Sequence, residues 1–293
     1  MISDTYRDRI VKYYDHCQID YEWAWNLKSR MAMHYGFWDE TTPRLRYALT
    51  NMNQQVAAFA PVRDADHVLD AGCGVGGSSI FLAQHHRCRV AGITLSEKQV
   101  QASRDNASRL GVADRCHFEA RSYLATGFPD NTFDIVWAVE SVCYAPDKAE
   151  FLREAFRVLK PGGRLIVADF YENNVAPGTS GAALMHRMAK SWAIESFADK
   201  DRFWHDLVRT GFVDCRQRDV SPHVQRTVNK LYRRFFLGLP ITLVLQAVGY
   251  RNWTQFANVM SAYYQYHAFR RGLWRYMFHA GTKPLVQGTA SGA

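Results

Sequence analysis

The stretch Val68–Gly77, VLDAGCGVGG, decides the fold of this 293-residue chain. It begins as a short apolar run and then places glycines at positions 72, 74, 76 and 77. Glycine tolerates positive φ angles and lets a ligand come close to the backbone. A helix that begins after such a loop also offers free N–H groups to a bound ligand. The stretch therefore predicts a buried strand, a ligand-binding loop and a helix, in that order.

Strands and helices are expected to alternate along the next hundred residues. We expect strands at 67–71, 88–94, 115–120, 133–139 and 164–169, and helices at 78–86, 97–110 and 148–159. The stretch 133–139 (FDIVWAV) is almost continuously apolar, as is typical of a strand covered on both faces. This alternation predicts an α/β fold with a doubly wound, mostly parallel, Rossmann-like sheet.

The composition and the hydrophobic pattern of the sequence divide the chain into three regions. Residues 1–60 are aromatic-rich and read as a helical N-terminal arm, and residues 61–171 form the ligand-binding core. Residues 172–293 are expected to supply a helical lid, the remaining strands of the sheet and a C-terminal helix, with an amphipathic aromatic stretch at 254–276. In such folds ligands bind at the carboxyl ends of the strands, which the lid should cover.

Composition limits the partners and the location of the protein. With 47% hydrophobic and 14% aromatic residues, the chain can build a large apolar pocket, and its net charge of +8 favours an anionic partner. It lacks a run of five basic residues and any familiar nucleic-acid module, so no nucleic-acid partner and no membrane span are predicted. Six cysteines without a C-x-x-C pair argue against a zinc site or a disulfide framework, which favours the reduced cytoplasm. The oligomeric state stays open, a homo-oligomer included.

The glycine loop is compatible with more than one ligand. Gly72, Gly74 and Gly77 satisfy G-x-G-x-x-G, so the pattern alone does not exclude NAD. Asp70, however, would repel a pyrophosphate and suits a ligand that carries an ammonium and a sulfonium. The D-x-G-x-G-x-G arrangement resembles the first motif of the class I S-adenosylmethionine (SAM) methyltransferases.

Three downstream segments strengthen this resemblance. GITLSEKQ (92–99) is similar to cyclopropane fatty acid synthases and tocopherol-type methyltransferases, and PDNTFD (129–134) and LKPGG (159–163) resemble later motifs of the same class. The resemblance implies SAM as cofactor, held at its amino-acid end by Asp70, Gly72, Gly74 and Tyr14. It also implies ribose contacts from Thr94, Ser96 or Gln99 and adenine contacts from Ser122 and Tyr123. Backbone contact alone with adenine is the alternative, because the family often has Asp where this chain has Ser122.

The residues after the fourth expected strand indicate the acceptor. ESVCY (140–144) resembles the corresponding segment of geranyl diphosphate C-methyltransferases. YYD (13–15) and YEWAW (21–25) look like alkene methylators of the prenyl and sterol type, and MHYGFW (33–38) looks like the segment through which substrate enters the prenyl-diphosphate and tocopherol-type enzymes. The resemblance implies catalytic roles for Glu140 and Tyr35. Substrate contacts are expected from His34, Trp38 and Tyr144. Arg233 and Arg234, directly before Phe235, are candidates for a diphosphate head group, because arginine offers bidentate contacts to phosphate.

These residues also have purely structural interpretations. Glu140 can cap a turn or pair with an arginine, Tyr14 and Tyr35 can be core aromatics, and a single histidine such as His34 is more often packed than catalytic. Arg233 and Arg234 can simply be surface arginines, which are common.

The favoured function is SAM-dependent C-methylation of an alkene carbon in an isopentenyl, geranyl or farnesyl diphosphate, as part of terpenoid or other natural-product biosynthesis. Attack by the alkene creates a carbocation, which aromatic faces stabilise and which is then deprotonated or rearranged. A diphosphate would bring Mg²⁺, although no compact acidic motif identifies its ligands. The alternative is an O- or N-methyltransferase acting on a bulky apolar natural product of the tocopherol or polyketide type. A third interpretation is a SAM- or NAD-binding protein without methyl transfer.

Overall fold

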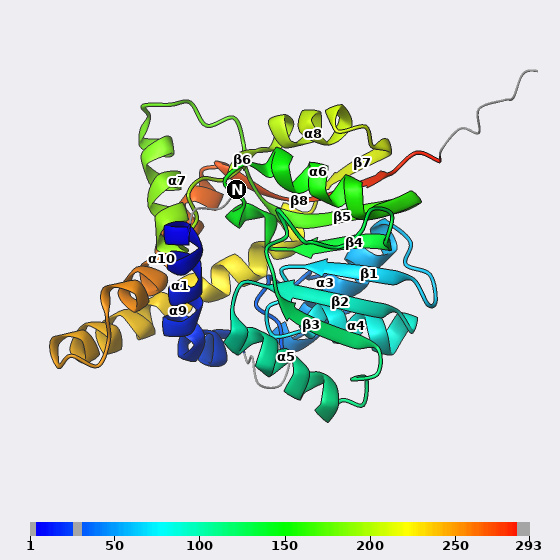
Figure 1. Ribbon diagram of the computed structural model, residues 1–293. Helices are drawn as coiled ribbons and strands as arrows, with labels where there is room; N and C mark the ends of the chain where they lie inside the picture. The colour runs from blue at the N-terminus through cyan, green and yellow to red at the C-terminus, as the bar shows by residue number, and fades with distance from the viewer. Residues whose placement is uncertain (1–3, 26–30, 286–293) are drawn as a thin grey trace, which may run out of the picture.

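The structure is a computed structural model that describes residues 4–25 and 31–285, without the side chains of residues 4, 18, 19 and 22–25. Its centre is an eight-stranded sheet in the order β3-β2-β1-β4-β5-β8-β7, with β6 beside β5 (Figure 1). The strands are β1 His67–Ala71, β2 Arg89–Thr94, β3 Cys116–Ala120, β4 Phe133–Val139, β5 Leu159–Glu172, β6 Ala198–Asp199, β7 Val213–Asp219 and β8 Trp274–Thr282.

The direction of the strands confirms the predicted fold class. Strands β1 to β5 run parallel, and β8 runs antiparallel to both β5 and β7. The strand order reverses between β1 and β4, and in open α/β sheets ligands bind where this reversal occurs. The loops that leave the carboxyl ends of β1 and β4 therefore lie at the expected binding position.

Helices cover both faces of the sheet because the strands are apolar on both sides. Helices α3 Leu45–Phe59, α4 Gly77–His86 and α5 Glu97–Arg109 pack on one face, and α6 Lys148–Val158 and α8 Lys200–Arg209 pack on the other (Figure 1). Along β4, Ile135 and Trp137 join the first core, whereas Val136 and Ala138 join the second. All four side chains are fully buried, as the unbroken apolar pattern of this strand requires.

A second group of helices lies beside the strand ends. It consists of α1 Asp4–Trp25, α7 Ser180–Ser191, α9 Ser221–Ala247 and α10 Trp253–Arg270. Helix α10 packs against α1, α7 and α9, and the paired ends of α9 and α10 project from the rest of the molecule (Figure 1, yellow and orange). Within the described residues, no helix is both long and apolar enough to cross a bilayer.

Two sequence expectations differ from the structure. The N-terminal region is not continuously helical, because residues 32–34 and 36–39 have no regular secondary structure and α3 begins only at Leu45. The aromatic stretch 254–276 also splits, since α10 ends at Arg270 and β8 begins at Trp274. Gly272, at φ +69°, lies in the left-handed conformation that commonly ends a helix.

The glycine loop requires glycine at its first position. Gly72 has a φ of +101°, and a Cβ placed on it would lie 2.3 Å from the Cβ of Ser141. Ser141 in turn donates a hydrogen bond from Oγ to the carbonyl oxygen of Ala71 at 2.5 Å. The loops that follow β1 and β4 are therefore in direct contact, and Gly72 makes this approach possible.

We expect Gly72→Ala to lower the free energy of unfolding by about 2 to 5 kcal/mol, because it adds a steric clash to an unfavourable backbone conformation. Gly111→Ala is the matched control, since Gly111 also has a positive φ of +70° but has no atom within 4 Å of the added Cβ. The control should lose only about 1 to 2 kcal/mol. Urea unfolding followed by circular dichroism measures both, and equal losses would contradict the assigned contact.

Candidate active site

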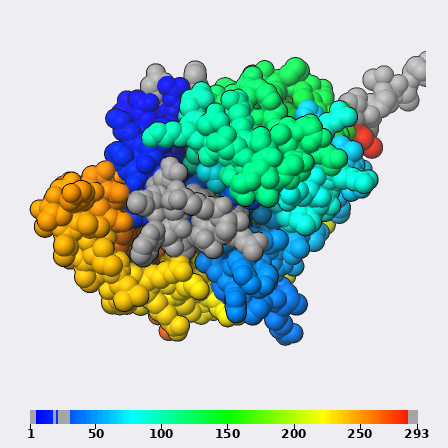
Figure 2. All heavy atoms as spheres, turned by 90° about the horizontal axis from the view of Figure 1, so that it is seen from below, coloured from blue at the N-terminus to red at the C-terminus, as the bar shows by residue number. Residues whose placement is uncertain are grey.

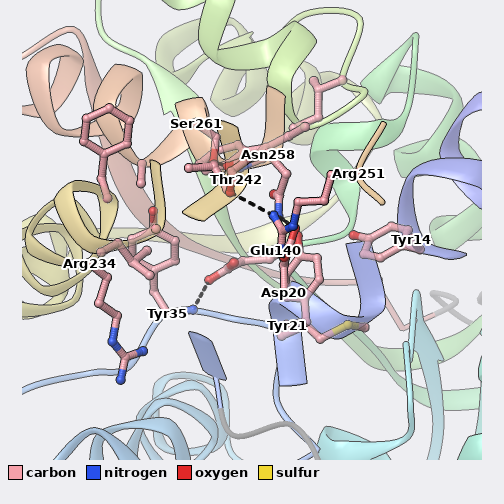
Figure 3. Close-up of a pocket in the computed structure, with 18 of the residues that line it drawn as sticks. Tyr14, Asp20, Tyr21, Tyr35, Glu140, Arg234, Thr242, Arg251, Asn258 and Ser261 are labelled. Atoms are coloured by element: carbon pink, nitrogen blue, oxygen red, sulfur yellow. Dashed lines mark hydrogen bonds and ion pairs between the residues drawn. The ribbon is translucent and has the colours of Figure 1, made fainter. Parts of the chain in front are cut away.

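Two adjoining cavities lie at the carboxyl ends of the strands. The first, here called the loop cavity, has a volume of about 90 Å³ and is lined by the glycine loop and the start of α5. The second, here called the lid cavity, has a volume of about 630 Å³ and is lined largely by α1, α9 and α10. Figure 3 shows the lid cavity with Glu140 and several tyrosines around it.

The loop cavity gathers most of the residues predicted to hold the cofactor. Its lining includes the residues Tyr14, Asp70, Gly72, Gly74, Thr94, Ser96, Gln99 and Tyr123. The N-terminal arm covers this cavity closely, because the Met33 Cε atom would lie only 2.7 Å from a Cβ added to Gly74. The residues that implied SAM binding from the sequence thus lie together.

Hydrogen bonds fix the polar groups of the loop cavity. Ser79 donates from Oγ to Oδ2 of Asp70 at 2.6 Å, and Thr94 donates from Oγ1 to Oε1 of Gln99 at 2.6 Å. Ser96 caps α5, because its side chain accepts a bond from the Gln99 N–H. Burial raises the pKa of Asp70 to about 7, against the opposing effect of the bonds from Ser79. A cation beside Asp70 would favour its ionised form.

Ser122 lies apart from this group. It does not line either cavity, and its Oγ accepts a hydrogen bond from the Leu124 N–H at 3.2 Å. Tyr123 does line the loop cavity, and its hydroxyl donates to the Ser141 carbonyl at 2.8 Å. The predicted adenine contacts stay predictions for both residues.

Glu140 is the acidic group at the junction of the two cavities. Among the described residues, four line both of them, namely Tyr14, Met33, Glu140 and Tyr144. The hydroxyl of Tyr14 donates to that of Tyr144 at 3.1 Å, so two of the four are linked. These side chains therefore mark the place where a group held in one cavity would meet a group held in the other.

The Glu140 carboxylate is held by two donors from distant parts of the chain. Its Oε1 accepts a bond from the Tyr35 backbone N–H at 2.5 Å and one from the Tyr276 hydroxyl at 2.8 Å. Burial raises the pKa of Glu140 well above its usual value, while the bonds from Tyr35 and Tyr276 lower it. Glu140 itself has a φ of +51°, a strained conformation that persists only where the surroundings impose it.

Tyr35 takes part in the site through its backbone as well as its ring. Its ring lines the lid cavity, and its hydroxyl donates to Oε1 of Gln265. Its ring also packs edge-on against Phe170, with 5.1 Å between ring centroids. This arrangement fixes the N–H that binds Glu140, so Tyr35 acts at least as a positioning residue.

The structure separates the predicted substrate residues. Tyr144 and Arg234 line the lid cavity, whereas Arg233 and Trp38 line neither cavity. Trp38 is buried, donates from Nε1 to Thr227 at 2.8 Å and carries the Arg226 guanidinium over its ring.

His34 lies on the loop-cavity side of the site. It lines the loop cavity rather than the lid cavity, and burial lowers its pKa. Its Nδ1 lies 2.9 Å from the Tyr35 carbonyl, and its Nε2 has no hydrogen-bond partner among the described residues. For the motif YEWAW, the side chains of residues 22–25 lie outside the described residues.

Several residues of the site carry no local sequence signal. Tyr276 reaches Glu140 across 136 residues, and Gln265 reaches Tyr35 across 230. At the far wall of the lid cavity, Arg251 pairs with Asp20 and donates to Thr242 at 3.1 Å, and Asn258 donates to Asp20 at 3.2 Å (Figure 3). These contacts join α1, α9 and α10.

The described residues of the two cavities do not form a recognisable metal-binding site. Among the residues that the structure describes, no group of three or more His, Cys, Asp or Glu side chains is placed to hold a metal ion. The predicted Mg²⁺ stays an expectation tied to a diphosphate substrate.

Comparisons with known proteins agree with this site. Residues 69–167 match the family model described as a methyltransferase domain. The chain is 34% identical over 221 residues to the 27-O-demethylrifamycin SV methyltransferase of Amycolatopsis mediterranei. This alignment covers 74% of this chain and 77% of that protein.

Solved structures resemble the whole fold. The [4+2]-cyclase SpnF matches with a TM-score of 0.78 at 22% identity, covering 94% of this chain and 95% of that one. Geranyl diphosphate C-methyltransferase from Streptomyces coelicolor A3(2), solved with Mg²⁺, geranyl-S-thiolodiphosphate and S-adenosyl-L-homocysteine, matches with a TM-score of 0.74 at 18% identity, covering 95% and 98%. At these identities the structural matches establish the fold alone.

We expect Asp70 to make stability depend on pH in the ligand-free protein. An unfolded Asp titrates near pH 3.9, whereas the folded pKa is about 7, so the folded state binds more protons and stability falls as pH rises between these values. Asp70→Asn should remove the part of this fall that Asp70 causes, while Glu140 and Asp169, whose pKa values are also raised by burial, keep their own contributions. The free energy of unfolding of the Asp70→Asn variant should equal that of the wild type at pH 4. Above pH 7 it should exceed that of the wild type by about 2 to 4 kcal/mol.

Urea unfolding across this pH range measures the difference. Asp105→Asn is the control, because Asp105 lies on the exposed face of α5, and it should follow the wild-type curve. A constant offset between Asp70→Asn and the wild type at every pH would contradict the expected titration.

Proposed function

Because this chain belongs to the class I SAM-dependent methyltransferases, we propose that it transfers the methyl group of SAM to a hydroxyl oxygen of a bulky, neutral and mostly apolar acceptor. The observation that carries the proposal is the position of Glu140, a half-buried residue that lines both cavities. In this proposal the loop cavity holds SAM, the lid cavity holds the acceptor, and Glu140 is the base.

The residues of the loop cavity fit SAM. Gly72 and Gly74 leave backbone open beside the ligand, and Asp70 offers a carboxylate to its positive charges. Polar groups of Thr94, Ser96 and Gln99 line the same cavity and suit the ribose hydroxyls. When bound, SAM supplies an electrophilic methyl group on a sulfonium.

Glu140 is suited to removing the proton of a hydroxyl acceptor. Its raised pKa makes the Glu140 carboxylate a stronger base than an exposed glutamate. The bonds from Tyr35 and Tyr276 hold Oε1 in place, so the carboxylate is oriented before the acceptor arrives. The surrounding rings of Tyr14, Tyr144 and Phe170 help to exclude water from the reacting groups.

The charge of the lid cavity favours a neutral acceptor over a diphosphate. Among the residues that the structure describes, its lining contains two arginines, Arg234 and Arg251, and two acids, Asp20 and Glu140, so their formal charges balance. Arg251 is already paired with Asp20. A diphosphate head group would need an excess of positive charge, whereas a prenylated phenol or a polyketide would not. The similarity to the rifamycin O-methyltransferase supports this acceptor class.

C-methylation of a prenyl diphosphate is the second candidate, and the aromatic lining supports it. The rings of Tyr21, Tyr35 and Phe170 line the lid cavity together with Glu140. Aromatic faces stabilise a carbocation, and Glu140 would then take the final proton. Mg²⁺ would accompany the diphosphate, and Arg234, which lines the cavity, would supply a positive charge to it.

Incubation with methyl-labelled SAM distinguishes the two candidates. The acceptors are prenylated phenols and hydroxylated polyketides in one set, and isopentenyl, geranyl and farnesyl diphosphates with and without Mg²⁺ in the other. We expect label in an ether product of the first set. Label in prenyl diphosphates alone would overturn the proposal in favour of the second candidate, and no labelled product from either set would overturn both.

We expect Glu140→Gln to bind SAM normally and to lose turnover by about 100-fold or more, because the amide cannot accept the proton. Isothermal titration measures SAM binding, and labelled product measures turnover. Glu40→Gln is the control, since Glu40 is exposed and lines neither cavity. Turnover retained by Glu140→Gln would remove Glu140 from the role of base.

We expect Tyr276→Phe to shift the acidic limb of the kcat/KM profile to higher pH. The Tyr276 hydroxyl lowers the pKa of Glu140 by donating to it, so its removal should raise that pKa further and demand a higher pH for ionisation. A uniform loss of rate without a shift of the limb would show that Tyr276 has only a structural role.

A further inference from the structure

The tip of the α9–α10 hairpin exposes an unusual amount of apolar surface. The residues that contribute most, with their exposed fractions, are Leu237 (74%), Val244 (64%), Val248 (60%), Tyr250 (82%) and Trp253 (76%). From Phe235 to Tyr250 the chain has no charged residue at all. Contiguous exposed apolar surface of this kind marks an interaction site.

The charge of the protein is concentrated in the segment that carries this tip. Residues 220–293 contain nine lysines and arginines and no Asp or Glu. The formal net charge of +8 therefore resides entirely in this segment, since residues 1–219 hold 27 basic and 28 acidic residues. Arg226, Arg233 and Arg234 are exposed along α9 directly before the apolar tip.

The exposed tip is continuous with the lid cavity. Leu237 and Ile241 line this cavity and yet are 74% and 55% exposed. The same turns of α9 therefore form the cavity wall on one side and the outer apolar surface on the other. Figure 2 shows the hairpin (yellow and orange) forming one edge of the molecule.

We propose that the α9–α10 tip docks on an anionic lipid bilayer. Its apolar side chains enter the interface, Tyr250 and Trp253 lie at the head-group level, and the arginines of α9 meet anionic head groups. Amphipathic helical elements with basic flanks and aromatic residues bind membrane surfaces in this way. Docking places the wall of the lid cavity against the bilayer. An apolar acceptor can then enter the cavity directly from the bilayer, without crossing water. This entry route rests on the proposed function, whereas the docking does not depend on it.

A second copy of the chain is a poorer occupant of this surface. A symmetric dimer through the tip would bring together two segments that each lack acidic residues. Like charges placed opposite one another oppose association. An anionic bilayer satisfies both the apolar tip and its basic flank.

Co-sedimentation with vesicles tests the proposal on the full chain without any acceptor. The vesicles are phosphatidylcholine alone or phosphatidylcholine with phosphatidylglycerol. We expect binding to the anionic vesicles that weakens with added salt. The triple variant Val244→Ser, Val248→Ser, Trp253→Ser should lower the partition coefficient roughly tenfold or more. None of its three positions lines a cavity.

The matched control removes exposed apolar groups elsewhere. Val208 and Val213 are 48% and 44% exposed on α8 and β7, so Val208→Ser with Val213→Ser should bind vesicles like the wild type. Thermal melts check that each variant is folded, and if the triple variant melts early, Trp253→Ser alone takes its place.

Two results would overturn the docking. One is equal binding by the patch and control variants. The other is a dimer in light scattering that the patch variant abolishes, with no vesicle binding by the wild type. A protein that binds vesicles but methylates no acceptor would leave the docking intact and overturn only the proposed function.

Discussion

The candidate active site depends on the way the half-buried Glu140 is held. Two hydrogen bonds, from the Tyr35 N–H at 2.5 Å and the Tyr276 hydroxyl at 2.8 Å, join the end of β4 to the N-terminal arm and to β8. A buried acid without such donors would be costly. These contacts also fix the arm and the last strand relative to the sheet, so the shape of both cavities follows from them.

The two cavities differ in how far the sequence predicts them. The loop cavity is built from segments that each follow a strand, so the glycines after β1 and the motif Thr94 to Gln99 identify it locally. Strand β4 is predicted at its observed bounds, 133–139, because a strand buried on both faces is continuously apolar. Ser122 illustrates the limit, since its hydroxyl accepts from the Leu124 N–H while its adenine contact stays a prediction.

The lid cavity could not be predicted in the same way. Tyr276 and Gln265 reach the site from more than a hundred residues away, and neither belongs to a motif. The aromatic pattern from 254 to 276 is compatible with one continuous helix. The structure instead ends the helix before Gly272 and forms β8, because β8 pairs with the distant strand β5. The excess of basic residues after position 219 can be counted in the sequence, but only the structure shows that it lies beside the exposed apolar part of α9.

The contact between the N-terminal arm and the glycine loop has a kinetic consequence. Met33 lies over Gly74, while Met33 and Tyr14 also form part of the lid-cavity wall. Under the proposed function, SAM in the loop cavity would lie beside Met33, so its exchange would require the arm to move aside, and an acceptor in the lid cavity would hold the arm in place. Such a geometry favours a compulsory order, with SAM entering before the acceptor and the demethylated cofactor leaving after the product.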